Sequence, residues 1–519
     1  MSAVLAGKAA TAMLTGQRAL LATSCLVFFV LLKQLFDQAA TTAIISYLEH
    51  AARATSTPEN GTVPSGTTAG KQLTVNLGEQ AVLASSDALE GYNQFCQRLH
   101  EAGLLDVGFV LKTGSTEIYD KLPIHLSTTF ACLDAKQDFL VYSDVAQSFG
   151  NFEVLDALAL VSNETRADVS DFTEHERLKE HVRLGGDAAD LKGDKAWDLD
   201  KWKFLPMISD AYSAFHARKK WLFFIEADTY VSLSNLLLWL SHLDLTQPIY
   251  AGAQVLIDTT EFAHGGSGFL LSMPAAQTFR ETYLRDRQRW ELAIAADCCG
   301  DKVLADVLQA AEPPINLLRS FPLTQGETLW SLDWSPTHWC MPAVTWHHVN
   351  AAGNDKLHQH DRAFLAQHTT LHPILFRDYF KFFILPRLRA GNFTLPAWDN
   401  LSSDIAFSAS SSPSASSFGA GEYNIAAETA WACQQSCEQT PACVQWAWRK
   451  GSCRANKVVR FGWDHKHRPA LGSAEDRIDA VGEEEADGAV SGWMEGRIEN
   501  HVSRMGECDE RRYWITKNE

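Results

Sequence analysis

The segment Trp221–Val231 (WLFFIEADTYV) constrains the fold of this 519-residue chain more than any other. Its first five residues, Trp221–Ile225, are large and apolar, and they predict a strand covered on both faces. Glu226 and Asp228 follow at once, separated only by Ala227. Ligands of open α/β sheets bind at the carboxyl ends of the strands, so the two acids are placed to hold a divalent cation against a phosphate-bearing ligand. The alternative is an Asx-type turn with solvated carboxylates.

Further stretches extend this pattern. Asp106–Lys112 and Phe139–Tyr142 predict strands, and Lys201–Arg218 predicts a helix. Strands that alternate with helical stretches favour an α/β domain. We place this domain at residues 92–400.

The length and charge of the chain narrow its class. A chain of 519 residues is too long for one core and predicts two or three domains. Its formal net charge is −18, and no block of lysine and arginine stands out. Because nucleic-acid binding needs such residues to neutralise phosphates, we expect no nucleic-acid partner.

The N-terminal region predicts a membrane anchor. The apolar run Ala19–Leu32 is flanked by Arg18 and Lys33. We interpret residues 19–36 as an uncleaved signal-anchor helix and residues 1–18 as a cytoplasmic tail; the alternative is a cleaved signal peptide. Residues 37–91 include a stretch rich in Ser, Thr, Gly and Pro, which predicts an extended stem. Both interpretations send the chain into the secretory pathway.

Cysteines and glycosylation sequons agree with that compartment. Of the eleven cysteines, Cys25 lies inside the apolar run, which leaves ten for the lumenal part. An even number in an oxidising compartment favours disulfides. Sequons at Asn60, Asn163, Asn392 and Asn400 favour a glycoprotein.

The C-terminal part predicts a second, smaller domain. Residues 401–421 are a low-complexity linker rich in Ser and Ala, and residues 422–519 follow it. This region holds four closely spaced cysteines, which predict a small fold stapled by disulfides. Zinc is the alternative, but the spacings are not those of the usual paired ligands. The four are Cys433, Cys437, Cys443 and Cys453.

Three segments carry a resemblance to a known family. Lys219–Gly252, which contains the acids, resembles the central segment of glycosyltransferase family 31, the family of Fringe and the core-1 β-1,3-galactosyltransferases. His264–Ser272 (HGGSGFLLS) resembles its glycine-rich segment, and Pro342–Val349 (PAVTWHHV) resembles its late histidine motif. The resemblance covers roughly Asp106–Phe383. It is closest to fungal members, in which a cysteine-rich module follows the catalytic domain.

The resemblance implies a GT-A fold, in which a Rossmann-like sheet binds a UDP-sugar and Mn²⁺ grips the diphosphate. It implies that Asp228 is a metal ligand and that His347 is a further contact with the metal, with His348 as its substitute. Glu226 matches the family's first acid but departs from it, because Glu replaces Asp and Ala227 replaces a frequent middle acid. A carboxylate and imidazole set suits Mn²⁺. The alternative for His347 is a core histidine without a ligand.

The resemblance also implies a donor pocket. Glycines let the backbone approach a ligand and present N–H groups to it. Asp144 is expected to accept a hydrogen bond from uracil or ribose, or else to cap a helix. Lys203 is expected near the diphosphate, or else as an exposed helix lysine. The expected donor-binding set is Thr113, Gly114, Asp144, Lys203, Glu226, Gly265, Gly266 and Gly268.

The catalytic base is expected between the glycine-rich segment and the late histidine. Family 31 enzymes invert at the anomeric carbon, which requires a carboxylate to deprotonate the acceptor hydroxyl. Asp297, Asp301 and Asp306 are the candidates. Asp301 resembles the family's acid at the start of a helix and is the expected base, although such an acid also serves as a helix cap.

The tail Ala432–Gly462 resembles a PAN/apple-like module, and such modules commonly bind carbohydrate or protein. One of three possible pairings is nested, with Cys437–Cys443 inside Cys433–Cys453, and we expect that one. In the catalytic region we expect Cys298 or Cys299 to bridge to Cys340.

These expectations describe a UDP-sugar-dependent hexosyltransferase. It would move galactose or N-acetylglucosamine to a glycan or glycoprotein hydroxyl in a β-1,3 linkage, as a single-pass type II protein of the Golgi membrane with a lumenal catalytic domain. The alternative is a catalytically inactive, membrane-tethered protein that binds carbohydrate or protein on the same scaffold. The departure at Glu226 and Ala227 favours the alternative, whereas Asp228, His347 and Asp301 favour the enzyme.

Overall fold

The computed structural model describes residues 90–150, 152–407, 426–465, 488–505 and 507–518. The described residues all belong to one unit of the chain, Ala81–Glu519. The predicted cytoplasmic tail, signal-anchor and nearly all of the stem therefore lie outside the described residues, as does most of the predicted linker. In the described part of the chain, no helix is both long and apolar enough to cross a membrane.

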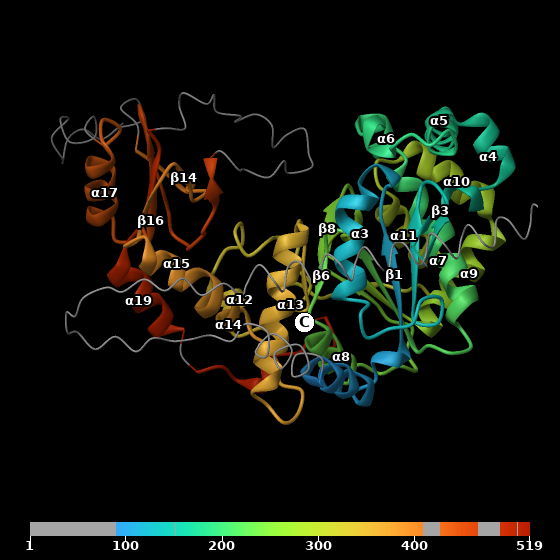
Figure 1. Cartoon of the computed structure of the whole chain (residues 1–519), viewed down its shortest axis with the longest axis horizontal. Helices are drawn as coiled ribbons and strands as arrows, with labels where there is room; N and C mark the ends of the chain where they lie inside the picture. The colour runs from blue at the N-terminus through green and yellow to red at the C-terminus, as the bar shows by residue number, and fades with distance from the viewer. Residues whose placement is uncertain (1–89, 151, 408–425, 466–487, 506, 519) are drawn as a thin grey trace, which may run out of the picture. The chain divides into compact units, whose positions relative to one another are not determined.

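An eight-stranded sheet forms the centre of the larger domain, in the order β11-β7-β10-β5-β1-β2-β4-β3 (Figure 1). The pairs β1–β2, β1–β5, β2–β4 and β7–β11 are parallel, and the pairs that involve β10 or β3 are antiparallel. The α/β prediction is confirmed, and the mostly parallel sheet is consistent with a GT-A fold. The strands are β1 (Val107–Lys112), β2 (Phe139–Ser143), β3 (Gln147–Phe149), β4 (Phe152–Asp156), β5 (Trp221–Glu226), β7 (Tyr250–Gly252), β10 (Phe269–Ser272) and β11 (Leu317–Arg319).

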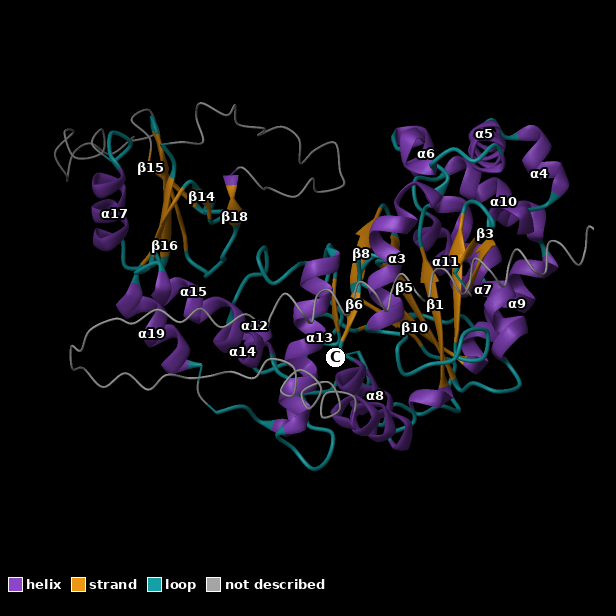
Figure 2. Ribbon diagram, viewed as in Figure 1, coloured by secondary structure: helices purple, strands orange, loops and turns teal. Residues whose placement is uncertain are grey.

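Helices cover both faces of this sheet (Figure 2). Successive side chains of β5 alternate between two cores, as side chains of a strand must. Leu222 and Phe224 join one core, and Trp221, Phe223 and Ile225 join the other. The strand is therefore buried on both faces, as its apolar run predicts. The first core includes α7 (Phe204–Phe215), α9 (Met273–Arg285), α10 (Arg287–Ala296) and α11 (Gly300–Gln309), and the second includes α3 (Ile118–Ser127) and α8 (Leu233–Leu240).

The helix predicted over Lys201–Arg218 is present with different ends. It begins as the short 3₁₀ turn η5 (Asp200–Lys203), continues as α7 and ends at Phe215. Other helices of the larger domain are the helix over residues 90–101, α4 (Asn163–Asp168), α5 (Asp171–Arg183), α6 (Asp194–Trp197), α12 (Pro336–Trp339), α13 (Ala351–Ala366), α14 (Phe376–Tyr379), the π-helical turn η6 (Phe380–Ile384) and α15 (Leu385–Ala390). Its short strands are β6 (Tyr230–Val231), β8 (Gln254–Ile257), β9 (Thr260–Ala263) and β12 (Thr345–Trp346).

A separate antiparallel sheet lies in the C-terminal region, in the order β13-β19-β16-β17-β15. It takes strands from both sides of residues 408–425, so chain before and after the predicted linker contributes to it. Its elements are β13 (Thr394–Pro396), β15 (Ile405–Phe407), β16 (Gln445–Arg449), β17 (Ser452–Asn456) and β19 (Val490–Trp493), accompanied by β14 (Trp398–Asp399), β18 (Trp463–Asp464), α17 (Ala430–Gln439) and α19 (Glu495–Arg504).

Ten cysteines form five disulfides, as their even number predicts. The nested pairs Cys433–Cys453 and Cys437–Cys443 are confirmed. The predicted bridge to Cys340 is wrong, because Cys298 pairs with its neighbour Cys299 at the start of α11 and Cys340 pairs with Cys508. Sequence could not reveal this, since Cys340 and Cys508 are 168 positions apart. The fifth pair is Cys96–Cys132.

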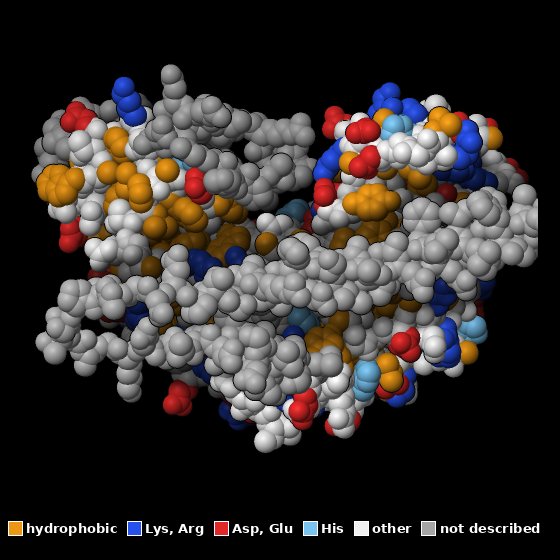
Figure 3. Space-filling model, viewed as in Figure 1, with side chains coloured by type: hydrophobic (Ala, Val, Ile, Leu, Met, Phe, Trp, Pro, Cys, Tyr) orange, Lys and Arg blue, Asp and Glu red, His pale blue; other side chains and the backbone are white. Residues whose placement is uncertain are grey.

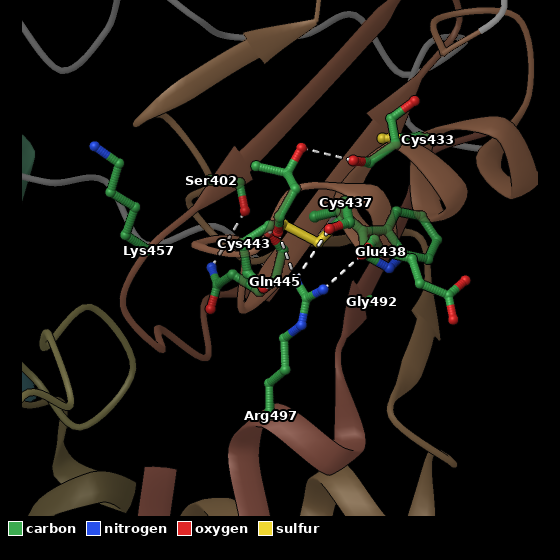
Figure 4. Close-up of a disulfide and its surroundings, with 12 residues drawn as sticks. Ser402, Cys433, Cys437, Glu438, Cys443, Gln445, Lys457, Gly492 and Arg497 are labelled. Carbon is green, nitrogen blue, oxygen red and sulfur yellow. Dashed lines mark hydrogen bonds between the residues drawn. A yellow bond between two sulfur atoms is a disulfide. The ribbon is translucent and has the colours of Figure 1, made fainter. Parts of the chain in front are cut away.

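Arg497 ties α19 to the inner disulfide of the C-terminal region (Figure 4). Its guanidinium donates to the carbonyl oxygens of Cys437 at 3.0 Å, Thr440 at 2.7 Å and Cys443 at 2.5 Å. A further N–H donates to the carbonyl oxygen of Glu438 at 2.6 Å. Because these carbonyls lie at the end of α17 and in the loop after it, one side chain satisfies several terminal acceptors of the helix.

On the face shown in Figure 3, acidic and basic side chains of the described residues are interspersed.

The three sequon asparagines among the described residues differ in exposure. Asn163 and Asn392 are exposed, but Asn400 is fully buried. The amide nitrogen of Asn400 donates to the carbonyl oxygen of Trp446 at 3.0 Å, so this sequon is not open to glycosylation in the folded chain.

Candidate functional site

A short antiparallel ladder brings the late histidine to the acids. In the β6–β12 pair, Trp346 lies opposite Tyr230. The next residue of β12's segment, His347, therefore reaches back towards the turn after β5, and its Nε2 lies 3.4 Å from Oδ1 of Asp228. The backbone N–H of Val349 donates to the carbonyl oxygen of Asp228 at 2.8 Å and fixes the same approach.

Asp228, His347 and His348 form a group whose ligand atoms all lie within 4.8 Å of one another. Nδ1 of His348 is 3.9 Å from Oδ2 of Asp228. Lys121 of α3 lies on the other side, with its Nζ 3.1 Å from the same oxygen. A carboxylate with two imidazoles is a donor set that suits Mn²⁺, so the residues present fit a divalent cation. Nε2 is the ring nitrogen of His347 that faces Asp228, whereas its Nδ1 is buried and has no hydrogen-bond partner among the described residues.

Asp228, His347 and Lys121 shift the pKa values of one another. Burial raises the pKa of Asp228, but the hydrogen bond and charge of His347 and the charge of Lys121 outweigh it and hold that pKa well below its usual range. Burial lowers the pKa of His347, whereas the hydrogen bond and charge of Asp228 raise it, and the net shift is upward. Asp228 is therefore an ionised carboxylate throughout the physiological range, as a metal ligand must be.

Glu226 stands beside this group and is not a member of it. Its Oε1 lies 3.0 Å from Nζ of Lys112, the last residue of the neighbouring strand β1. Lys112 also bonds the carboxylate of Asp200. Burial lowers the pKa of Lys112, and the two carboxylates raise it by more. Glu226 is therefore the ion-pair partner of the buried Lys112 ammonium group, at the edge of the site.

The glycine-rich segment is folded against the acids and the late histidine. Oγ1 of Thr229 donates to the carbonyl oxygen of Gly266 at 2.7 Å, which fastens the two turns together. A Cβ on Gly266 would lie 2.3 Å from Nε2 of His347, and one on Gly265 would lie 2.7 Å from the Phe204 ring and 3.2 Å from Oε1 of Glu226. Gly268 has a φ of +77°, which L side chains rarely adopt.

Asp301 reaches the same segment from the start of α11. Its Oδ2 accepts from the backbone N–H of Gly265 at 2.9 Å, and its Oδ1 accepts from the N–H of Lys302 at 3.0 Å. Burial raises the pKa of Asp301 to about 6; the Gly265 N–H and Lys112 oppose this rise, and Glu226 adds to it. The other candidate acids face elsewhere, because Asp297 pairs with Lys302 at 2.5 Å and Asp306 accepts from Thr260 at 2.9 Å.

Lys203, Asp144 and Thr113 form a buried network at the ends of β1 and β2. Nζ of Lys203 donates to the carbonyl oxygen of Thr113 at 2.9 Å and lies 3.3 Å from Oδ2 of Asp144. The Asp144 Oδ1 accepts from the N–H of Ser115 at 2.9 Å, and Gly114 lies next to the same carboxylate. Lys203 is 2 % exposed, so it is not the exposed helix lysine that we gave as an alternative. Its role and that of Asp144 in donor binding stay predictions.

Sequence reasoning overlooked three charged side chains of this region, Lys112, Lys121 and Asp200. Lys112 ends β1 just as Glu226 ends β5, and the two are register partners. The charged residue at the end of each apolar run can be read from the sequence, but the pairing of the two strands in register cannot. Lys121 and Asp200 lie on a helix and a 3₁₀ turn far from the acids in sequence, and only the fold brings them there.

The assembled arrangement combines three chemical capacities. Asp228 and the histidines offer ligands for a cation, and the glycine-rich turn lets a ligand approach the backbone closely. Asp301 offers a buried carboxylate whose pKa is raised to about 6. Together these groups suit the stabilisation of a charged leaving group and the removal of a proton from an incoming hydroxyl.

Comparison with known proteins covers part of this arrangement. Residues 199–311 match the Fringe family model, described as Fringe-like. No curated protein matches the chain. The matched range contains Glu226, Asp228, the glycine-rich segment and Asp301, whereas His347 lies beyond it. Over residues 199–311 the chain is therefore similar to the Fringe-like glycosyltransferases.

Proposed function

We propose that the chain is an inverting, UDP-sugar-dependent hexosyltransferase that moves galactose or N-acetylglucosamine to a glycan or glycoprotein hydroxyl in a β-1,3 linkage. The observation that carries the proposal is the meeting of Asp228, His347 and the glycine-rich segment, with Asp301 on the other side of Gly265. The Fringe-like match over residues 199–311 supports it. We further propose a single-pass type II protein of the Golgi membrane with a lumenal catalytic domain.

Asp228, His347 and His348 would hold Mn²⁺. A bound cation at this point would offset the negative charge of a departing diphosphate. Asp228 is suited to this task because its carboxylate stays ionised. Lys121, 3.1 Å from Asp228, adds a positive charge on the same side.

Asp301 would accept the proton of the acceptor hydroxyl. A general base works best when its pKa lies near the operating pH. Burial moves the pKa of Asp301 to about 6, closer to neutrality than that of an ordinary aspartate. The Gly265 N–H on Oδ2 orients the carboxylate at the glycine-rich segment, where the donor sugar is expected.

UDP release by the purified full chain tests this function. A panel of UDP-sugars is assayed with Mn²⁺ or with EDTA, for the wild type and for Asp228→Asn. Turnover of one donor that is lost with EDTA and in the variant supports the transferase. Asp258→Asn is the matched control, because the Asp258 side chain is 81 % exposed.

The second candidate is an inactive carbohydrate- or protein-binding protein on the same scaffold. The ion pair between Glu226 and Lys112 favours it, since the family's first acid is engaged elsewhere. If no donor is turned over and Mn²⁺ with UDP leaves the melting temperature unchanged, this candidate takes the place of the transferase.

A further inference from the structure

A cleft of about 830 Å³ lies between the glycine-rich segment of the larger domain and the C-terminal sheet. Pockets of about 300–1,000 Å³ are the usual size for small-molecule ligands, so this cleft has room for a ligand of several rings. One wall includes His264, Ser267, Gln325 and Glu327. The facing wall comes from residues beyond 397 and includes tryptophans and arginines of the C-terminal region.

The first wall is continuous with the candidate catalytic site. Ser267 belongs to the glycine-rich segment, and its carbonyl oxygen accepts from Oγ1 of Thr345 at 2.6 Å. The ring of His264 lies 5.3 Å from the ring of His347, centroid to centroid. The backbone N–H of His347 donates to the carbonyl oxygen of Glu327 at 3.3 Å. A ligand in the cleft therefore lies one layer of residues away from the proposed metal ligands.

Three tryptophans, Trp398, Trp448 and Trp463, line the second wall. Two of them are held in place through their indole N–H groups, which donate to the carbonyl oxygen of Phe461 at 2.6 Å and of Ala427 at 3.0 Å. The indole N–H of Trp463 is buried, and it has no hydrogen-bond partner among the described residues. Trp463 lines the cleft with another part of its side chain or backbone, so its place in the wall does not depend on this donor.

The two walls are joined firmly enough to keep the cleft formed. Arg460 makes an ion pair with Asp333 across the boundary. The backbone N–H of Trp334 donates to the carbonyl oxygen of Val459 at 2.9 Å, and the backbone N–H of Gly462 donates to the carbonyl oxygen of Trp330 at 2.7 Å. A binding site that is already formed loses less conformational entropy when its ligand binds.

The charges of the cleft favour a neutral ligand. Its lining carries three arginines and three acids, so neither sign dominates. Fixed indole rings and interspersed hydrogen-bonding side chains match a sugar chain, because a pyranose ring presents an apolar face of C–H groups and an edge of hydroxyls. The residues are Arg449, Arg454, Arg460, Glu327, Asp333 and Asp399.

We propose that this cleft binds the acceptor as a neutral oligosaccharide. The tryptophan wall of the C-terminal sheet holds the non-reacting sugars, and the reacting hydroxyl points to the glycine-rich segment. This inference rests on the proposed function in naming the ligand an acceptor, but oligosaccharide binding is measurable without any turnover.

Direct binding to the purified full chain tests the proposal. The probes are tri- and tetrasaccharides of galactose, N-acetylglucosamine, mannose and glucose, together with an unglycosylated Ser/Thr-rich peptide. Trp448→Ala should weaken the binding of the best oligosaccharide about tenfold, and Trp448→Phe should restore most of it. Trp431→Ala is the matched control, since Trp431 is in the same region, is 68 % exposed and lies outside the cleft.

Arg454→Ala gives a second, independent variant, because Arg454 is exposed on β17 and lines the cleft. Weaker oligosaccharide binding in this variant and in Trp448→Ala, with Trp431→Ala unchanged, supports the proposal. Binding of the peptide alone, of no probe, or of oligosaccharides with equal affinity in all variants overturns it. Failure of UDP release in the earlier assay would instead overturn the transferase and leave this binding measurement intact.

Discussion

Gly266 lies against the imidazole of His347 so closely that a Cβ at this position would stand 2.3 Å from Cε1 and from Nε2. The ring cannot retreat without leaving the carboxylate of Asp228, 3.4 Å from Nε2. The glycine-rich segment therefore does more than permit a turn. It gives the histidine the space to meet the acid, and it couples the backbone of one motif to the geometry of another.

The first prediction concerns this contact. Gly266→Ala should displace the His347 ring and weaken Mn²⁺ binding about 10–100-fold, the usual effect of disturbing the groups that orient a metal ligand. Isothermal titration with Mn²⁺ measures it. Gly496→Ala in α19 is the control, because a Cβ there has nothing within 4 Å and alanine favours a helix. Equal Mn²⁺ affinity in the Gly266 variant would show that the ring does not hold the metal.

The second prediction follows from the pKa of Asp301, which burial raises to about 6. A general base acts only when it is unprotonated, so kcat/KM should rise as the pH increases through about 6 and level off above it. Asp301→Asn should lower kcat by about 10²–10⁴-fold and remove this rise. The pH profile of UDP release measures both effects.

Asp306→Asn serves as the matched control for that experiment. Asp306 is on the same helix, but its Oδ1 accepts from the Thr260 hydroxyl at 2.9 Å and does not reach the glycine-rich segment. We expect this variant to keep the wild-type profile. A profile that stays intact in Asp301→Asn, or that is lost in Asp306→Asn instead, would assign the base elsewhere.

The third prediction concerns the contribution of the buried pair Lys203–Asp144 to stability. Lys203→Met leaves the carboxylate of Asp144, 1 % exposed, without its cation, and should lower the free energy of unfolding by about 3–5 kcal/mol. Lys136→Met is the control. Its Nζ lies 2.8 Å from a carboxylate oxygen of Glu153, closer than Lys203 lies to Asp144, but both side chains are about 60 % exposed, and the loss should stay below about 1 kcal/mol. Denaturant unfolding compares them, and equal losses would mean that the buried pair gives no extra stability.

Sequence predicted the parts of the fold that depend on local pattern. The apolar run of β5 predicted burial on both faces of the strand. Successive side chains of a strand point to opposite faces, so a run without polar residues leaves neither face suited to solvent. The nested cysteine pairs are the one of three possible pairings that we expected beside the PAN/apple-like resemblance, and the structure contains them. The start of α7 differs from the prediction, because the first turn of that segment is the 3₁₀ turn η5, in which Lys203 lies next to Asp144 and Thr113.

The parts that sequence could not supply depend on distant partners. Lys112 meets Glu226 because two strands pair in register, and the alternation of apolar residues says nothing about which strands are neighbours. Asn400 begins a glycosylation sequon, and the sequence does not show that its side chain is buried in the folded C-terminal region. The burial that moves the pKa of Asp301 likewise comes from packing beneath the glycine-rich segment, and no motif encodes it.

The last prediction contrasts two disulfides. Cys340–Cys508 joins positions 168 apart and fastens the C-terminal segment to the larger domain, whereas Cys298–Cys299 joins neighbours. A crosslink restricts the unfolded chain more when it closes a longer loop. Replacing both Cys340 and Cys508 by serine should therefore lower the free energy of unfolding by about 2–5 kcal/mol. The same change at Cys298 and Cys299 should cost little, because adjacent residues close almost no loop.

Thermal unfolding without reductant compares the two double variants with the wild type. A clear fall in melting temperature for Cys340→Ser/Cys508→Ser alone fits the pairing in the structure. If the Cys298→Ser/Cys299→Ser variant loses as much stability, those two cysteines close a longer loop in solution, and the bridge to Cys340 that sequence suggested becomes the better assignment. The same pair of variants thus tests the stabilising effect of the long crosslink and the cysteine pairing itself.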